Sequence, residues 1–114
     1  MAPESGVHRI YVNSNSIFAV TANISRDDDL NNYTTPGVYN CSSATVAATL
    51  SNKPSAVTTG FKMVAVPAGY GQFVSYGLQI ILMGSGSIVP RIYLRSSLNG
   101  SWSSWRSIDT TEVS

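Results

Sequence analysis

The sequence predicts a mainly β fold, a small antiparallel β-sandwich-like domain with at most one short helix. No long segment places its apolar residues at helical spacing, whereas short segments that alternate apolar and polar residues recur along the chain. Turn-forming pairs such as Pro36-Gly37 and Asn99-Gly100 separate these segments. A chain of 114 residues suits a single domain with a core of its own.

Two short strands are expected at the start of the chain. Residues Val7–Val12 and Ser16–Ile24 alternate, and turn residues lie between them, so these strands could pair as a hairpin. Arg26–Asp29 is a charged break. We therefore divide the chain into residues 1–26, an N-terminal β segment, and residues 27–114, a β domain.

The middle of the chain carries further strands and the one segment in which a helix is expected. Asn52–Ser55 supplies the residues that end this helix. Ile80–Met83 is apolar without alternation, which favours a central strand or a subunit interface because both faces require burial. In chain order we expect the strand Val38–Cys41, the helix Ser43–Leu50, the strand Gly60–Val66 and Gln72–Met83, as one bent strand or two short ones broken near Gly77.

The last third of the sequence is typical of a β-hairpin. Ile88–Arg95 shows the clearest alternation in the chain, and Pro90 indicates a strand start or an edge because proline donates no ladder hydrogen bond. Asn99-Gly100 favours a hairpin with Trp102–Ile108, although the gap from Arg95 to Trp102 exceeds a two-residue loop.

Composition argues against several classes of protein. A net charge of +1 with 11% charged residues provides no basic face for nucleic acid. No apolar run approaches the roughly 18 residues of a membrane span, and the N-terminus lacks a signal-peptide pattern, so we expect no membrane insertion. Cys41, the single cysteine, is expected to be a small apolar strand residue. Polarity comes from Ser, Thr and Asn, which suit neutral polar ligands such as sugars.

The segment Asp29–Tyr39 resembles the opening of a known domain. It reads Asp-Leu-Asn, a short spacer, Pro-Gly and an aromatic strand, and is similar to the knob domain of R-type pyocin tail fibres, a pattern shared by C-terminal receptor-binding domains of phage tail fibres. The resemblance covers residues 27–108 and departs from the pattern at Lys53 and around residues 65–76. The further matches, in order, are Asn52–Ser55, Gly60–Val66, Ile80–Met83, Ile92–Arg95, Asn99-Gly100 and Trp102–Ile108.

The resemblance implies a homotrimeric, knob-like fibre tip on a virion tail fibre or a phage-like particle, acting outside the cell. Its expected partners are copies of itself, the rest of the tail fibre and a bacterial cell-surface glycan. Its expected role is non-enzymatic adhesion to that glycan. The alternative is a structural knob that trimerises or caps the fibre and has no ligand of its own. Residues 1–26 would be a shaft remnant or a preceding small domain.

The C-terminal hairpin gathers the candidate glycan-binding residues. Trp102 and Trp105 lie three apart, so on a regular strand they point to opposite faces, and we assign Trp105 to the core. Aromatic rings stack on sugar C–H groups, and arginine donates to sugar hydroxyls. Arg–Tyr stacking at a solvated or inter-chain surface is the alternative explanation for the arginines and Tyr93. The candidates are Trp102, Tyr93, Arg95 and Arg91.

We expect no catalytic residue, no cofactor and no metal site. A glycan hydrolase needs two carboxylates at a defined separation, and here all acidic residues lie in breaks or tails. Asp27–Asp29 lacks the spacing of a calcium loop, and Asp29 is expected to cap a turn at Leu30–Tyr33. His8 could meet its copies on a trimer axis and bind a metal ion, but an ordinary strand position is preferred.

Overall fold

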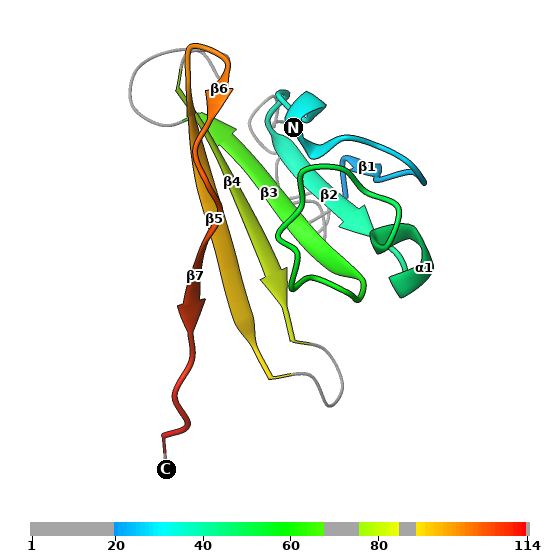
Figure 1. The fold of residues 1–114 in the computed structure, drawn as a ribbon, viewed down its shortest axis with the longest axis vertical. Helices are drawn as coiled ribbons and strands as arrows, with labels where there is room; N and C mark the ends of the chain where they lie inside the picture. The colour runs from blue at the N-terminus through cyan, green and yellow to red at the C-terminus, as the bar shows by residue number, and fades with distance from the viewer. Residues whose placement is uncertain (1–19, 68–75, 85–88, 114) are drawn as a thin grey trace, which may run out of the picture.

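The structure is a computed structural model of the chain and describes residues 20–67, 76–84 and 89–113. Its described strands form one sheet in the order β1-β2-β3-β4-β5-β6, with β7 also paired to β5 (Figure 1). The β1–β2 pair is parallel and the other pairs are antiparallel. The elements are β1 Ala22–Asn23, the 3₁₀ helix η3 Leu30–Asn32, β2 Gly37–Cys41, α1 Ala44–Ala47, β3 Phe61–Pro67, β4 Tyr76–Met83, β5 Arg91–Leu98, β6 Ser101–Trp102 and β7 Arg106–Asp109.

The mainly β fold with one short α-helix, α1, is confirmed, and η3 adds a single 3₁₀ turn. The described strands form one sheet where a sandwich was expected. Loops and short helices, rather than a second sheet, cover one face of the sheet (Figure 1). From these covering segments Leu30, Ala47 and Val57 are fully buried. They pack in one cluster with the strand residues Tyr39, Cys41, Phe61, Met63, Ala65, Ile81 and Tyr93.

The register explains how these strand residues meet. Tyr39 lies opposite Met63, Met63 opposite Ile81, and Ile81 opposite Tyr93, so one row crosses four strands. Side chains alternate between the two faces of a sheet, and this row therefore lies on the covered face. We call the opposite face of the same strands the outer face.

The outer face is also apolar. One row contains Val38, Val64, Ile80 and Leu94, all half-buried. In the next row Leu82 is 42% exposed and Ile108 is 50% exposed, and half-buried Ile92 lies between them. Both helices of the described part of the chain pack against the covered face, through Leu30 and Ala47, and not against the outer face. The expectation of a central strand at Ile80–Met83 is confirmed, because β4 lies between β3 and β5; its alternative, a subunit interface, stays a prediction.

The C-terminal hairpin forms as expected and is tighter than the sequence indicated. β5 continues to Leu98, which lies opposite Ser101, so Asn99-Gly100 is a two-residue turn. Both turn residues have positive φ, 51° and 87°, as in the type I′ turns that join twisted strands. The return strand is interrupted between β6 and β7. Of the expected strand segment Gln72–Met83, β4 covers Tyr76–Met83 and continues through Gly77, and residues 72–75 lie outside the described residues.

The expected strand Val7–Val12 and residues 16–19 of the expected strand Ser16–Ile24 lie outside the described residues. Of the latter, Ala22–Asn23 forms β1 and pairs with β2 in parallel. The expected helix within Ser43–Leu50 is confirmed as α1, which Ser43 caps by accepting from the Val46 amide. The boundary at residue 26 stays a prediction.

Replacing Gly100 with alanine should destabilise the protein by about 1–2 kcal/mol. Its φ of 87° disfavours any residue with a Cβ, and a Cβ built there would meet no atom within 4 Å. The cost is therefore one of backbone conformation alone. Urea unfolding measures it, and Asn99→Gly is the control, with an expected change below about 0.5 kcal/mol. An equal loss in both variants would contradict this account of the turn.

Candidate functional site

An open groove of about 570 Å³ lies where the β5–β6 hairpin meets the loops on the covered side. We call it the tryptophan groove. One wall carries Arg95 from β5, together with Trp102 and Trp105. The other wall carries Asn31 of η3, Asn52 and Lys53, and the hairpin adds Gly100, Ser101, Ser103 and Ser104 to the lining.

Arg95 contacts both tryptophan rings of the groove. Its guanidinium carbon is 4.2 Å from the ring centroid of Trp102 and 4.5 Å from that of Trp105, both within cation–π range. Arg95 is only 5% exposed, and its Nε donates to Gln79 Oε1 over 2.9 Å. Burial lowers the pKa of Arg95 to about 10, and the charge of Asp29 opposes this shift, so the side chain is a buried cation at neutral pH.

The two indole rings connect the hairpin to the opposite wall. Trp102 Nε1 donates to the Asn31 carbonyl over 3.3 Å, and Trp105 Nε1 donates to the Asn52 carbonyl over 2.8 Å. Both rings are half-buried and pack against the core. The expectation that they point to opposite faces is wrong, because β6 ends at Trp102 and the chain leaves the strand before Trp105.

The structure brings together two of the four candidate residues, Trp102 and Arg95. Tyr93 is 7% exposed and belongs to the core, so a solvated Arg–Tyr surface on this strand face is not formed. The burial of Tyr93 was not predictable, because the alternation of apolar and polar residues defines two strand faces. It does not indicate which face the loops before β3 cover.

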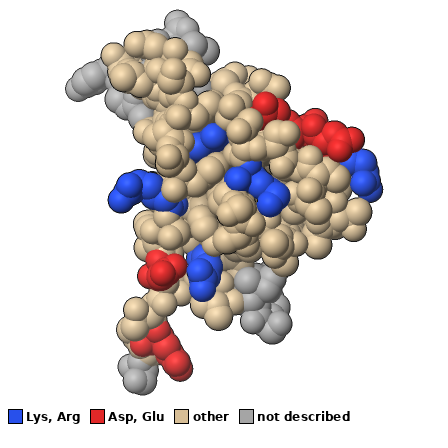
Figure 2. Space-filling model, viewed as in Figure 1, with Lys and Arg blue, Asp and Glu red and all other residues tan. Residues whose placement is uncertain are grey.

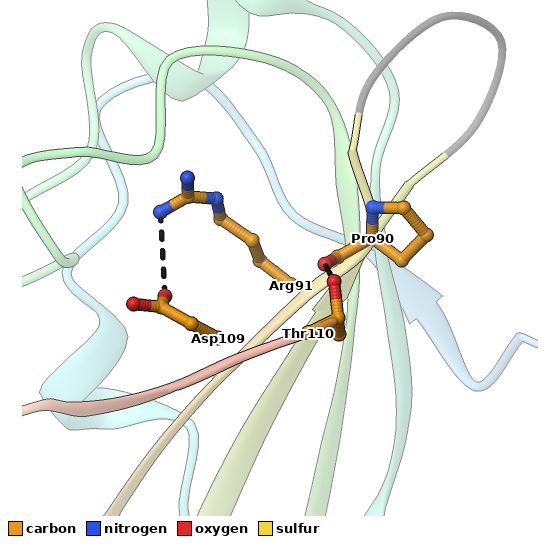
Figure 3. Close-up of polar contacts among 4 residues, drawn as sticks. All are labelled: Pro90, Arg91, Asp109 and Thr110. Carbon is orange, nitrogen blue, oxygen red and sulfur yellow. Dashed lines mark hydrogen bonds and ion pairs between the residues drawn. The ribbon is translucent and has the colours of Figure 1, made fainter. Parts of the chain in front are cut away.

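Arg91 lies at the far end of β5 from the tryptophan groove. Its Nη1 is 3.5 Å from Asp109 Oδ1, and both side chains are largely exposed. Beside this pair, Thr110 Oγ1 donates to the Pro90 carbonyl over 2.8 Å (Figure 3). These contacts join β5 to the end of β7, and an exposed pair of this kind contributes little to stability.

Gln79 holds Arg95 in place beneath the groove, and this role was not predicted from the sequence. It is fully buried in β4, and its Nε2 donates to the carbonyls of Leu30 and Tyr33 over 2.8 and 3.1 Å. Its Oε1 accepts from Arg95, so one amide connects the η3 loop to the groove. The available signal was a single polar residue inside an apolar strand.

Asp29 organises the opposite wall and caps η3, as expected. Its Oδ1 accepts from the Asn31 amide and from Asn52 Nδ2, each over 2.8 Å. These hydrogen bonds, led by that of Asn52, hold the pKa of Asp29 below its ordinary value of 3.8. The ionised carboxylate therefore stabilises the fold.

Asp29→Ala should cost about 1 kcal/mol at pH 7 through loss of the cap. Because the pKa of Asp29 is lower in the folded state, its contribution is complete above the ordinary value of 3.8 and is lost as pH falls through the folded-state pKa. Thermal unfolding from pH 7 to pH 2 should show the two proteins converging in acid. Asp109→Ala, which breaks only an exposed ion pair, is the control. A difference in stability between the two proteins that does not change with pH would refute the capping role.

The remaining chemistry of the described chain is limited. Cys41 is buried, and burial raises the pKa of its thiol. The described residues contain no cluster of three or more His, Cys, Asp or Glu side chains able to hold a metal ion. No helix in this part of the protein is long and apolar enough to span a bilayer. On the face in Figure 2 the basic side chains are dispersed, while acidic ones gather at the upper edge and near the C-terminus.

The fold is similar to that of two solved pyocin fibre structures. The C-terminal part of the P. aeruginosa R1 pyocin fibre matches with a TM-score of 0.65 and 20% identity, over 79% of this chain and 21% of that one. An N-truncated R2-type pyocin tail fibre matches with a TM-score of 0.65 and 18% identity, over 79% of this chain and 32% of that one. The chain thus spans less than a third of either structure.

The resemblance found in the sequence is confirmed at the level of the fold, which is that of a pyocin tail-fibre-like domain. No protein-family model matches the chain, and no curated protein matches it.

Proposed function

We propose that the chain is the receptor-binding or tip domain of a phage or phage-like tail fibre and adheres, without catalysis, to a bacterial surface glycan. The observation that carries this proposal is the tryptophan groove, where Trp102, Trp105 and Arg95 lie beside serine and asparagine side chains. Indole rings stack on sugar C–H groups, and hydroxyls and amides bond to sugar hydroxyls. The pyocin-fibre fold supports a place on a tail fibre.

We further propose that three copies of the chain assemble and join the rest of the fibre. The outer face supports this assembly because its rows of Val, Ile and Leu are half-buried or exposed across β2 to β5. An apolar surface of this kind favours burial against another protein surface. Three grooves per fibre tip would bind a repetitive glycan with avidity.

A structural knob that trimerises or caps the fibre, with no ligand of its own, is the second candidate. The outer face favours it as much as it favours adhesion, because burying that face requires no glycan. The two candidates differ at the tryptophan groove, which only the adhesive role uses.

A glycan array and host envelope fragments, probed with the purified protein, test adhesion. Trp102→Ala should weaken binding at least about tenfold, because truncating a buried aromatic anchor commonly costs 2 kcal/mol or more. Circular dichroism establishes that the variant is folded, and Arg26→Ala, at an exposed turn position outside the groove, is the control. If the trimer binds neither glycan nor envelope while the complete fibre does, adhesion fails and the structural knob remains.

A further inference from the structure

We infer that the tryptophan groove recognises its glycan through an anionic group, a carboxylate or a phosphate, which binds Arg95. This inference rests on the function proposed above and names the class of glycan. The evidence for it is the environment of Arg95, a buried cation.

Arg95 is buried without a counter-ion. In the ranges that the structure describes, the one ion pair joins Arg91 to Asp109, at the far end of β5. Asp29 is close enough to influence Arg95 electrostatically, but its Oδ1 accepts from Asn31 and Asn52, and no ion pair with Arg95 forms. Burying an uncompensated charge is costly, and buried arginines are ordinarily paired. A bound anion would supply the missing charge.

Two polar atoms of the groove walls are buried and lack a hydrogen-bond partner, Arg95 Nη2 and Asn31 Oδ1. The first is a donor and the second an acceptor. An anionic oxygen can accept from Nη2, and a neighbouring sugar hydroxyl can donate to Oδ1. A sugar that carries an acidic group beside a hydroxyl therefore complements both atoms, whereas a neutral sugar leaves the charge uncompensated.

The other groups of the groove agree with this assignment. Lys53 adds a second positive side chain to the groove wall, and no described ion pair involves it. The guanidinium carbon lies over the faces of both indole rings, and these contacts hold the group in place before an anion binds. Charge-assisted hydrogen bonds of this kind are about twice as strong as neutral ones.

Fluorescence of the two tryptophans provides the test, since both rings contact Arg95. The probes are glucose as the neutral reference, glucuronate for a carboxylate, and glucose 6-phosphate and inorganic phosphate for a phosphate. We expect saturable, salt-sensitive responses to at least one charged sugar in the millimolar range and a response to glucose at least about tenfold weaker. The relative strength of the glucuronate and glucose 6-phosphate responses distinguishes carboxylate from phosphate.

Two variants localise the effect. Lys53→Gln should weaken the binding of the charged sugars by about threefold to tenfold, and Arg26→Gln, at an exposed position outside the groove, should change nothing. Arg95→Lys keeps the charge but loses the stacked plane, and it should reduce the response to charged sugars if the variant remains folded. A response to glucose as strong as the responses to both glucuronate and glucose 6-phosphate, or no response to any charged probe, overturns the inference.

Its failure is distinguishable from failure of the adhesive function. If the array shows binding to neutral glycans only, adhesion stands and the anionic preference is wrong. If the charged sugars bind in the groove while no host glycan or envelope fragment does, the anion site stands and the adhesive function is wrong.

Discussion

Replacing Gln79 with leucine should destabilise the protein by about 3–5 kcal/mol, because three buried groups lose their partner at once. The carbonyls of Leu30 and Tyr33 would lose their donor, and Arg95 Nε would lose its acceptor. The Arg95 guanidinium already has one unpartnered nitrogen in its buried setting, so the substitution leaves a buried cation with less compensation still.

Urea or thermal unfolding measures this loss, and Met63→Leu is the matched control. Met63 is fully buried in the neighbouring strand β3, and a volume-conserving apolar exchange there should cost less than about 1.5 kcal/mol. If the Gln79 variant loses no more stability than the Met63 variant, the amide is not what holds the η3 loop to the sheet. The tryptophan groove should also lose binding in Gln79→Leu, because Arg95 would no longer be fixed.

The local elements of this fold were predictable because their signals are local. Proline, glycine and asparagine mark the turns, and alternation marks β5 as a strand. Even the type I′ turn follows from Asn99-Gly100. Sequence reasoning placed the strand before this turn at Ile88–Arg95. It therefore included Val89 and Pro90, which lie before β5, and missed the last residues of β5, Ser96–Leu98, whose serines carry no strand signal.

The arrangement of the groove was not predictable from the same signals. Either face of β5 could have been covered, since Ile92 and Leu94 make one face apolar and Tyr93 makes the other partly so. The loops decide between them, and Gln79 meets Leu30 and Tyr33 across 49 and 46 residues of sequence. No pattern within a strand reports such a contact.

Leu94→Glu should convert the proposed trimer to a monomer at micromolar concentration. Leu94 lies opposite Ile80 in the apolar row of the outer face, flanked on its other side by Arg106 of β7. In a trimer that buries this row, a carboxylate would be desolvated at a cost of several kcal/mol per copy, and pairing with Arg106 would offset only part of that cost. In the monomer the side chain is half-buried at the surface, so the fold should survive the change.

Size-exclusion chromatography with light scattering measures the assembly, and circular dichroism establishes that the variant is folded. Ser107→Glu is the matched control, because it adds the same charge on the neighbouring strand β7, in the row of Tyr93 and therefore off the outer face. A wild-type monomer would remove the trimer together with the structural knob. If Leu94→Glu remains trimeric, the copies meet through another surface, and a different partner must cover the apolar rows of the outer face. If Leu94→Glu is monomeric and still responds to the sugar probes, the groove is complete within one chain, and only the avidity of adhesion depends on assembly.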